Sequence, residues 1–287
     1  MSVTQIAQGA VPRTVKRAAR RDWLVIISIG FIALMVLTAV FGPMLAPYDY
    51  TALFVGSANE APSVQHLFGT DSTGGDIFSR FLVGTPASLL GPLVIVILST
   101  ILGATFAITA AWFGGIVRGT LSRLIDVIFA IPGLVIAVLA VAMFGRGLVA
   151  PVIALSIAYI PVVARLTQTA ASRELGKPYI AALRIQGVSG FAICFKHLVP
   201  ALIPVVVAQM AVGFGYSMLD LAAISYLGLG NQPPAADWGR MIFEGQSSIL
   251  AGYPELVLFP ALCIVLTVLS VSIIGARVTI WAEEKER

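Results

Sequence analysis

Long apolar runs that alternate with short polar segments dominate this chain. Six runs are almost free of charge, and a bilayer core about 30 Å thick requires about 20 apolar residues for each helix that crosses it. We therefore expect an all-α membrane protein with six transmembrane helices in one domain, 23–282, between a basic tail, 1–22, and a short tail, 283–287. The expected spans are 24–46, 88–113, 127–144, 148–164, 198–227 and 256–276.

The distribution of Lys and Arg residues predicts the orientation of these spans. Basic residues crowd both tails, the segment between the second and third spans, and the segment between the fourth and fifth spans. Only Arg80, Arg146 and Arg240 lie in the alternate segments. Cytoplasmic loops carry the excess of Lys and Arg in membrane proteins, so both termini are expected in the cytoplasm. The first run is too long for the apolar core of a signal peptide, so we expect an uncleaved anchor.

Composition supports the membrane interpretation and narrows the function classes. Hydrophobic residues make up 58% of the chain and charged residues 11%, against about 45–50% and about 25% in soluble domains. These values exclude an ordinary soluble enzyme, a disordered chain and a disulfide scaffold. The net charge of +4 follows from the topology, so no nucleic acid partner is needed to explain it. The two cysteines are expected to pack as small hydrophobic side chains.

Two expected outer loops, 47–87 and 228–255, are long. Loops of more than about 12–15 residues are usually either functional or disordered. Both contain Gly, Pro and acidic residues, and the second contains the aromatic segment 238–243, so we expect ordered docking surfaces. The segment 71–76 has the oxygen atoms of a calcium loop but not its spacing, and it is predicted to form a tight turn.

The expected cytoplasmic loop, 172–200, has the pattern of two helices joined by a bend. Pro178 suits the first turn of a helix, and Gly187 suits the residue just past its end. Ser189 is a good cap for a second helix. The apolar residues expected on one face of that helix are Phe191, Phe195 and Leu198. Such an element fits a groove on another protein, and it equally fits a loop packed under the bundle.

Sequence motifs for covalent chemistry are absent. The chain has no P-loop with which to bind ATP, and it has no metalloprotease or serine hydrolase motif. The expected topology places its two histidines, His66 and His197, on opposite sides of the membrane, where they cannot share a metal ion. We therefore expect a non-catalytic chain that binds no metal and no cofactor of its own.

One acidic residue, Asp220, lies well inside an expected span. Ionisable residues within a bilayer are functional candidates. Gln209, Tyr216 and Ser217 occupy the same span, so the four side chains either line a polar pathway or form hydrogen bonds between helices. A proton-driven carrier usually has a series of ionisable groups, so a single acid gives little support for proton coupling.

Four sequence blocks resemble those of a known family. They are His66-Leu67-Phe68-Gly69-Thr70-Asp71 continuing to Arg80, Leu124-Ile125-Asp126-Val127 continuing to Pro132, the loop 172–200, and Tyr226-Leu227-Gly228-Leu229-Gly230-Asn231-Gln232-Pro233-Pro234 with Trp238-Gly239. Over about 17–282 the chain resembles the inner-membrane permease subunits of bacterial ABC importers, in the dipeptide, oligopeptide and nickel family. It looks most like the C subunit of the paired dipeptide permeases. The resemblance implies the type I ABC importer permease fold and a multi-pass location in the bacterial cell membrane.

The resemblance gives the loop 172–200 a role in coupling transport to ATP hydrolysis. The family pattern is E-A-A-x-x-x-G, nine residues, then I-x-L-P. Anchored on Gly187, its glutamate falls on Ala181 and its second alanine on Leu183, whereas Ala182 and Pro200 match. The remaining polar or aromatic candidates for contact with an ATPase are Glu174, Tyr179 and Arg184.

The resemblance also implies an assembly. A homologous second permease would complete the pathway, ABC ATPase subunits carrying ATP and Mg²⁺ would dock on the loop 172–200, and an extracytoplasmic substrate-binding protein would meet the outer loops. The residues expected to face that binding protein are Asp71, Asp76, Asp237, Trp238 and Arg240. Dipeptides or short oligopeptides carried by alternating access are the expected substrates. Nickel, haem and glutathione are alternatives, and an ion-coupled secondary transporter is the rival class.

Overall fold

The computed structural model describes residues 22–285, which are mostly helical. The basic tail expected over 1–22 and the final residues 286 and 287 lie outside the described residues, apart from the backbone of Asp22. In chain order the helices are α1 (Asp22–Leu45), α2 (Ile77–Phe113), α3 (Gly115–Phe129), α4 (Gly133–Phe144), α5 (Val149–Leu175), α6 (Pro178–Ile185), α7 (Gly190–Ile193), the π-helical turn η1 (Cys194–Leu198), α8 (Val199–Tyr226), α9 (Trp238–Glu244), α10 (Gln246–Leu250) and α11 (Glu255–Lys285).

Five helical segments are long and apolar enough to cross a membrane: α1, α2, α5, α7 to α8, and α11. α3 and α4 meet the same criterion as a pair, but they are bent by 73° relative to each other. Up to six spans result, in agreement with the expected number. The expected span 127–144 starts inside α3 and crosses this bend. The chain bends there because Pro132 has no N–H for helical hydrogen bonding and disfavours helical geometry at Ile131.

α2 begins well before the expected position 88. Its first residue is Ile77, because the Asp76 side chain accepts a hydrogen bond from the backbone N–H of Ser79 and caps the helix. The last part of the expected outer loop 47–87 is therefore the first part of a membrane-crossing helix.

α5 extends past the expected end of its span at 164 and finishes at Leu175. Thr167 and Ala171 keep one helical face buried beyond the apolar run, while charged residues such as Arg165 occupy the exposed face. The charge-free run thus marks the apolar section of this helix and not its full length.

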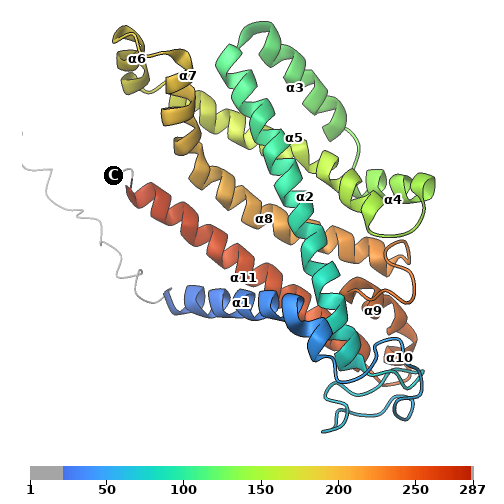
Figure 1. The fold of residues 1–287 in the computed structure, drawn as a ribbon. Coiled ribbons are helices and arrows are strands. Elements are labelled where there is room, and N and C mark those ends of the chain that lie inside the picture. The colour runs from blue at the N-terminus through green and yellow to red at the C-terminus, as the bar shows by residue number, and fades with distance from the viewer. Residues whose placement is uncertain (1–21, 286–287) are drawn as a thin grey trace, which may run out of the picture.

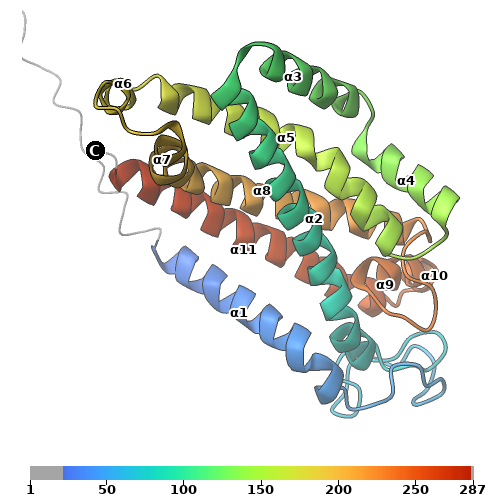
Figure 2. The same ribbon diagram turned by 45° about the horizontal axis from the view of Figure 1, so that its top comes forward.

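The long helices pack side by side, and short elements close the two ends (Figure 1). α2 crosses α5 and α8, with α11 and α1 on one side and the α3–α4 pair on the other, as both ribbon views show (Figure 2). α6 and α7 lie at the end where α2 meets α3. The segment 46–76 with α9 and α10 closes the opposite end, and we refer to these elements as the cap.

Three buried clusters hold the helices together. The first surrounds Trp238 near the cap, the second surrounds Leu155 between α4, α5 and α8, and the third surrounds Leu198 near α6. Both cysteines pack among hydrophobic side chains, as expected: Cys194 belongs to the third cluster, and Cys263 lies against the first. Separate clusters from end to end are consistent with long helices that share no single central core.

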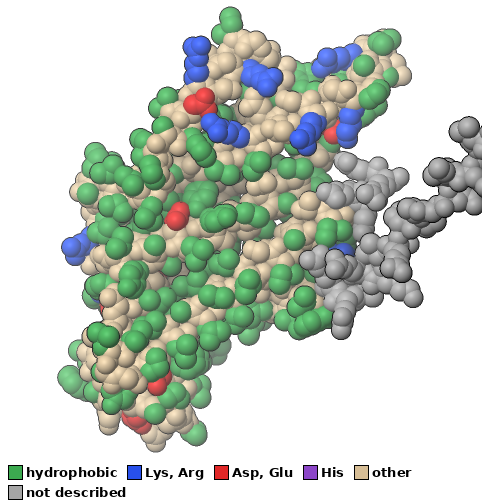
Figure 3. All heavy atoms as spheres, turned by 180° about the vertical axis from the view of Figure 1, so that it is seen from behind, with side chains coloured by type: hydrophobic (Ala, Val, Ile, Leu, Met, Phe, Trp, Pro, Cys, Tyr) green, Lys and Arg blue, Asp and Glu red, His purple; other side chains and the backbone are tan. Residues whose placement is uncertain are grey.

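Hydrophobic side chains also cover the middle of the molecular surface, as expected where lipid surrounds a protein (Figure 3). Lys and Arg side chains gather at the end that carries α3 and α6. Arg118, Arg165, Arg173 and Arg184 are all exposed there. This asymmetry agrees with the charge pattern from which the cytoplasmic side is inferred.

Candidate functional site

α6 is a short helix whose two ends are both defined by local sequence. Pro178 occupies the first turn, and Gly187 follows the last turn with a φ of +75°, as expected. The N–H of Val188 bonds to the carbonyl of Leu183 at 3.1 Å, and the N–H of Gly187 bonds to the carbonyl of Arg184 at 3.1 Å. This pair of bonds is a Schellman motif, which needs a left-handed residue at the position of Gly187.

A buried carboxylate fixes α6 to the end of α5. Glu174 accepts a hydrogen bond from the hydroxyl of Tyr179 at 2.6 Å, and its other oxygen lies 2.7 Å from Nζ of Lys177. Ile180 is buried below the same turn. Glu174 was expected to be available to a partner, but these contacts enclose it, so it acts inside the chain as an anchor for α6.

The outward face of α6 carries small and apolar side chains. Ala181 and Ala182 are exposed, and Ile185 is 87% exposed. Leu183 is half-buried, and the guanidinium of Arg184 lies 6.0 Å from the ring centre of Trp112 at the end of α2. α6 therefore presents a smooth apolar tip on a firmly held base.

The second helix of the loop differs from its expected form. Ser189 caps it by accepting a hydrogen bond from the N–H of Ala192, as predicted. Phe191 and Phe195 are exposed, with ring centres 4.4 Å apart, but Leu198 is fully buried. The prediction that Leu198 shares a face with Phe191 and Phe195 is therefore wrong. η1 forms i→i+5 hydrogen bonds, which shift the following residues around the helix axis.

Asp220 has a partner on another helix. The hydroxyl of Tyr159 on α5 donates a 2.9 Å hydrogen bond to Oδ2 of Asp220 on α8. Tyr159 was not among the predicted pathway residues, although it is the only Tyr in its expected span and carries a polar group into an apolar run. A half-buried carboxylate is thus held between two membrane-crossing helices.

A cavity of about 60 Å³ lies beside this pair and brings two other candidates together. Gln209 and Tyr216 line it with Tyr159, and so does Thr100, whose hydroxyl has no hydrogen-bond partner within residues 22–285. Ser217 lies elsewhere: it is fully buried and donates to the carbonyl of Phe214 at 3.0 Å, within 3.4 Å of the carbonyl of Pro92 on α2. Gln209, Tyr216 and Asp220 therefore belong to one polar region, whereas Ser217 lies outside it and donates to a backbone carbonyl.

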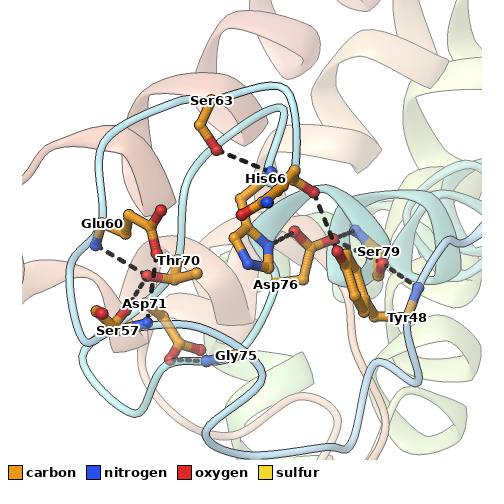
Figure 4. A network of polar contacts seen from close by, with 11 residues as sticks. Tyr48, Ser57, Glu60, Ser63, His66, Thr70, Asp71, Gly75, Asp76 and Ser79 are labelled. Carbon is orange, nitrogen blue, oxygen red and sulfur yellow. Dashed lines mark hydrogen bonds and ion pairs between the residues drawn. The ribbon is translucent and has the colours of Figure 1, made fainter.

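Asp76 organises the cap around the start of α2 (Figure 4). Its Oδ2 accepts hydrogen bonds from the N–H and hydroxyl of Ser79, and its Oδ1 lies 2.9 Å from Nδ1 of His66. Asp76 and His66 are both buried. The contact between His66 and Asp76 thus joins the segment 46–76 to the start of α2.

Asp71 forms the tight turn that the sequence predicts. Its Oδ1 accepts hydrogen bonds from the N–H groups of Thr73 and Gly75 at 2.8 and 3.0 Å, and its Oδ2 lies 2.7 Å from the guanidinium of Arg80. Burial acts to raise the pKa of Asp71, but the hydrogen bonds from Thr73 and Gly75 and the charge of Arg80 outweigh it and lower the pKa.

A chain of charges connects the two outer segments. Arg80 contacts both Asp71 and Glu244, and Glu244 in turn lies 2.7 Å from Nε of Arg240. Arg240 donates to the carbonyl of Asn231 at 2.6 Å. Residues far apart in sequence are thus joined through four side chains at the cap.

Asp237 and Trp238 begin α9 inside the protein. Asp237 caps α9 by accepting from the N–H of Arg240, and burial raises its pKa despite that hydrogen bond. Trp238 is 0% exposed and stacks on Phe81 with ring centres 5.2 Å apart.

The residues expected to face a binding protein therefore lie inside the cap. Asp71, Asp76, Asp237 and Trp238 are buried, and the Arg240 side chain is largely enclosed. Acidic side chains at tight turns are drawn inward because the backbone N–H groups there need acceptors. The exposed cap residues instead include several large apolar side chains, those of Leu53, Phe54, Val64, Leu67 and Leu250.

Metal binding has no support from side-chain positions. Within the part of the chain that the structure describes, no group of three or more His, Cys, Asp or Glu side chains is placed to hold a metal ion. Hydrogen bonding and helix capping account for the contacts of His66, Asp71 and Asp76.

Comparison with known proteins links this architecture to transport. Residues 99–280 match the family described as "binding-protein-dependent transport system inner membrane component", and 13–62 match the N-terminal transmembrane domain of oligopeptide transport permease C. The glutathione transport system permease protein GsiD of Pectobacterium atrosepticum is 36% identical over 248 residues, which cover 85% of this chain and 81% of that protein. GsiD of Escherichia coli O157:H7 is 35% identical over 260 residues, covering 90% and 86%.

Solved structures support the fold. An inward-facing form of the MetNI methionine ABC transporter aligns with a TM-score of 0.56 at 19% identity, covering 69% of this chain and 94% of that one. A second inward-facing form of MetNI aligns with a TM-score of 0.52 and covers 68% and 94%. At this level of identity, the likeness shows the arrangement of helices alone.

Proposed function

Because this chain belongs to the family of inner membrane components of binding-protein-dependent transport systems, an ABC importer permease family, we propose that it forms half of a peptide pathway. A homologous second permease would supply the other half. The observation that carries this proposal is the match of 99–280 to the family, with relatives that cover most of the chain. It is a multi-pass protein of the inner membrane.

α6 is the proposed contact with the ATPase subunits. Its apolar tip, formed by Ala181, Ala182 and Ile185, suits a hydrophobic cleft on a partner protein. The Glu174–Tyr179 contact ties the base of α6 to the end of α5, so a displacement of the tip would be passed to α5. ATP-dependent movement of the ATPase subunits would bias the permease between two conformations through the different contacts made in each.

The polar region between α5 and α8 is the proposed lining of the pathway. Tyr159, Gln209 and Tyr216 surround the small cavity, and Asp220 lies next to them through its hydrogen bond to Tyr159. These groups supply hydrogen-bond donors and one carboxyl group in otherwise apolar spans, which is the chemistry needed to pass a peptide backbone. ATP and Mg²⁺ would be bound by the partner chains.

Short peptides are the proposed substrates, and glutathione is the first one to test. The relatives that cover most of this chain are named as glutathione permeases, and glutathione is itself a tripeptide. Nickel and haem are less well supported, because the described spans hold no metal-binding group of side chains. The substrate-binding protein would dock on the cap through exposed apolar side chains such as Phe54 and Val64.

Reconstitution tests the proposal. The full-length chain would be placed in proteoliposomes with the second permease, the ATPase subunits and the binding protein, and uptake of labelled glutathione and dialanine would be measured. We expect uptake that needs both ATP and the ATPase subunits. Uptake driven by a proton or sodium gradient without the ATPase subunits would instead identify an ion-coupled secondary transporter. ATP-dependent uptake of nickel or haem, with neither peptide carried, would overturn the substrate assignment.

A further inference from the structure

Two adjoining hollows lie between the α3–α4 pair and α5, and their linings differ in character. The first, of about 630 Å³, is lined mainly by polar and charged side chains, among them Arg118, Arg165 and Arg173. The second, of about 780 Å³, is lined almost entirely by apolar side chains of α3, α4 and α5. The lining changes from polar to apolar between Asp126 and Val127, which are consecutive residues of α3. The two hollows follow one another along α3 and α5, and we refer to them together as the groove.

The polar part of the groove has an excess of positive charge. Asp126 is its only acidic residue, and Oδ1 of Asp126 lies 2.5 Å from the guanidinium of Arg165. Arg118 and Arg173 have no ion-pair partner within 22–285, so their charges are uncompensated there. The hydroxyl and amide groups that surround them belong to Ser122, Gln168, Thr169 and Ser172. This combination of guanidinium and hydroxyl donors suits a phosphate group.

Arg165 marks the boundary between the two parts. Its guanidinium lies 4.7 Å from the ring centre of Phe129 while it also pairs with Asp126. Beyond Phe129 the groove is bordered by the 73° break between α3 and α4, and apolar residues such as Leu139 and Ile153 line it. The groove therefore continues from a charged site into the apolar section of the bundle.

We propose that this groove binds one anionic phospholipid. The phosphate lies among Arg118, Arg165 and Arg173, and an acyl chain follows the apolar part along α4 and α5. Basic pockets between membrane helices on the cytoplasmic side are sites for anionic lipid headgroups. A small soluble anion would leave the apolar part uncovered, whereas a zwitterionic lipid would bring a positively charged ammonium group beside the arginines. The bound lipid links α3 to α5 beside the break.

Lipid retention tests this proposal. The full-length chain is exchanged into nanodiscs that contain equal amounts of phosphatidylglycerol and phosphatidylethanolamine, and native mass spectrometry counts the lipid that stays bound. We expect preferential retention of one phosphatidylglycerol. Arg118→Gln should lower this preference about fivefold, from the usual contribution of one basic residue near an anionic lipid surface. Arg173→Gln should give the same result, which covers the case in which Arg118→Gln fails to fold.

Arg123→Gln is the matched control, because Arg123 is an exposed arginine of α3 that does not line the groove. We expect it to keep the preference. Equal losses in Arg118→Gln and Arg123→Gln would overturn the proposal in favour of general electrostatic attraction, and no retained lipid would overturn it in favour of a groove covered by another subunit.

A second variant separates a lipid from a soluble anion. Ala150→Phe would fill part of the apolar section without changing the charge, and we expect it to reduce lipid retention. Unchanged retention in Ala150→Phe would show that no acyl chain occupies the apolar section, and displacement of the lipid by glycerol phosphate at matched concentration would show that the arginines bind a free anion. Either result would overturn the lipid proposal.

Discussion

Tyr159 on α5 and Asp220 on α8 are joined by a 2.9 Å hydrogen bond between two membrane-crossing helices. Loss of this bond would leave a half-buried carboxyl group without that donor. Substitutions at this pair can therefore distinguish a structural role of Asp220 from a role in transport.

Replacing Asp220 tests the pathway. We expect Asp220→Asn to change the relative uptake of cationic and anionic dipeptides, because it replaces the one carboxyl group of the polar region with an amide and keeps the shape of the side chain. Competition for uptake in the reconstituted transporter measures the change. Ser217→Ala is the control, since Ser217 is buried away from the cavity, and it should keep the wild-type profile. A wild-type profile in Asp220→Asn would assign Asp220 a structural role.

Gly187 tests coupling. Gly187→Val places a β-branched residue at a φ of +75°, at a cost of about 1–2 kcal/mol, and should disrupt the end of α6. We expect ATP hydrolysis to continue while uptake falls, with normal membrane insertion. Gly176→Ala is the matched control, because Gly176 has an ordinary φ of −82° and room for a methyl group. Normal uptake by Gly187→Val would refute the coupling role of α6.

The contact between Glu174 and Tyr179 tests whether α6 must be rigid. We expect Glu174→Gln and Tyr179→Phe each to increase hydrogen exchange over 178–186 and to lower uptake per ATP hydrolysed. A double-mutant cycle should give an interaction of about 1–2 kcal/mol, because the hydrogen bond involves a charged group. Strictly additive effects on exchange would mean that Lys177 and Ile180 hold α6 without this bond.

Asp71 and Asp237 should contribute to stability with opposite dependence on pH. The pKa of Asp71 is lower in the folded protein than the ordinary 3.8, so its contribution is present at neutral pH and is lost as pH falls through that lowered pKa. We expect Asp71→Asn to lower the midpoint of thermal unfolding at pH 7, with a loss of about 1.5–3 kcal/mol for its charged hydrogen bonds.

For Asp237 the expected dependence of stability on pH has the opposite sign. Its pKa is raised by burial, so the folded state favours the protonated form, and stability falls as pH rises from 3.8 through that raised pKa. Asp237→Asn keeps a capping side chain without the charge and should raise the midpoint at pH 7. The midpoints of both variants, followed between pH 3 and pH 7, test the two signs. A lower midpoint for Asp237→Asn at pH 7 would contradict this assignment.

Phe54 tests the surface of the cap. It is 83% exposed, so Phe54→Ala should weaken the affinity for the binding protein and leave the thermal midpoint unchanged. Trp238→Ala should instead destabilise the fold by about 3–5 kcal/mol, because it removes a buried ring from the first cluster. Calorimetric titration with the binding protein and thermal unfolding measure the two effects. Unchanged affinity for Phe54→Ala would remove that residue from the docking surface.

Features set by short-range chemistry could be predicted from the sequence. The number of spans follows from apolar runs, and the ends of α6 follow from Pro178 and Gly187. The tight turn at Asp71 and the helix N-cap at Ser189 also depend on hydrogen bonds to nearby residues. These signals need no knowledge of the tertiary arrangement.

Features that depend on distant residues could not be predicted. Glu244 meets Arg80 across 164 positions of sequence, and no local pattern indicates that pairing. The inward direction of Asp237 and the partner of Asp220 depend in the same way on which helices become neighbours. The π-turn at 194–198 was missed because hydrophobic spacing assumes a uniform helix, and the wrong face for Leu198 followed from that assumption.

The π-turn has a further consequence for the geometry of the loop. An α-helix advances about 100° per residue, so one additional residue between α7 and α8 rotates everything before it by that angle relative to everything after it. η1 thus sets the angle about the helix axis between the face that carries Phe191 and Phe195 and the polar face of α8. A chain shortened by one residue within 194–198 would keep its hydropathy profile and its spans, yet it would turn a different face of the segment toward the cytoplasmic partner.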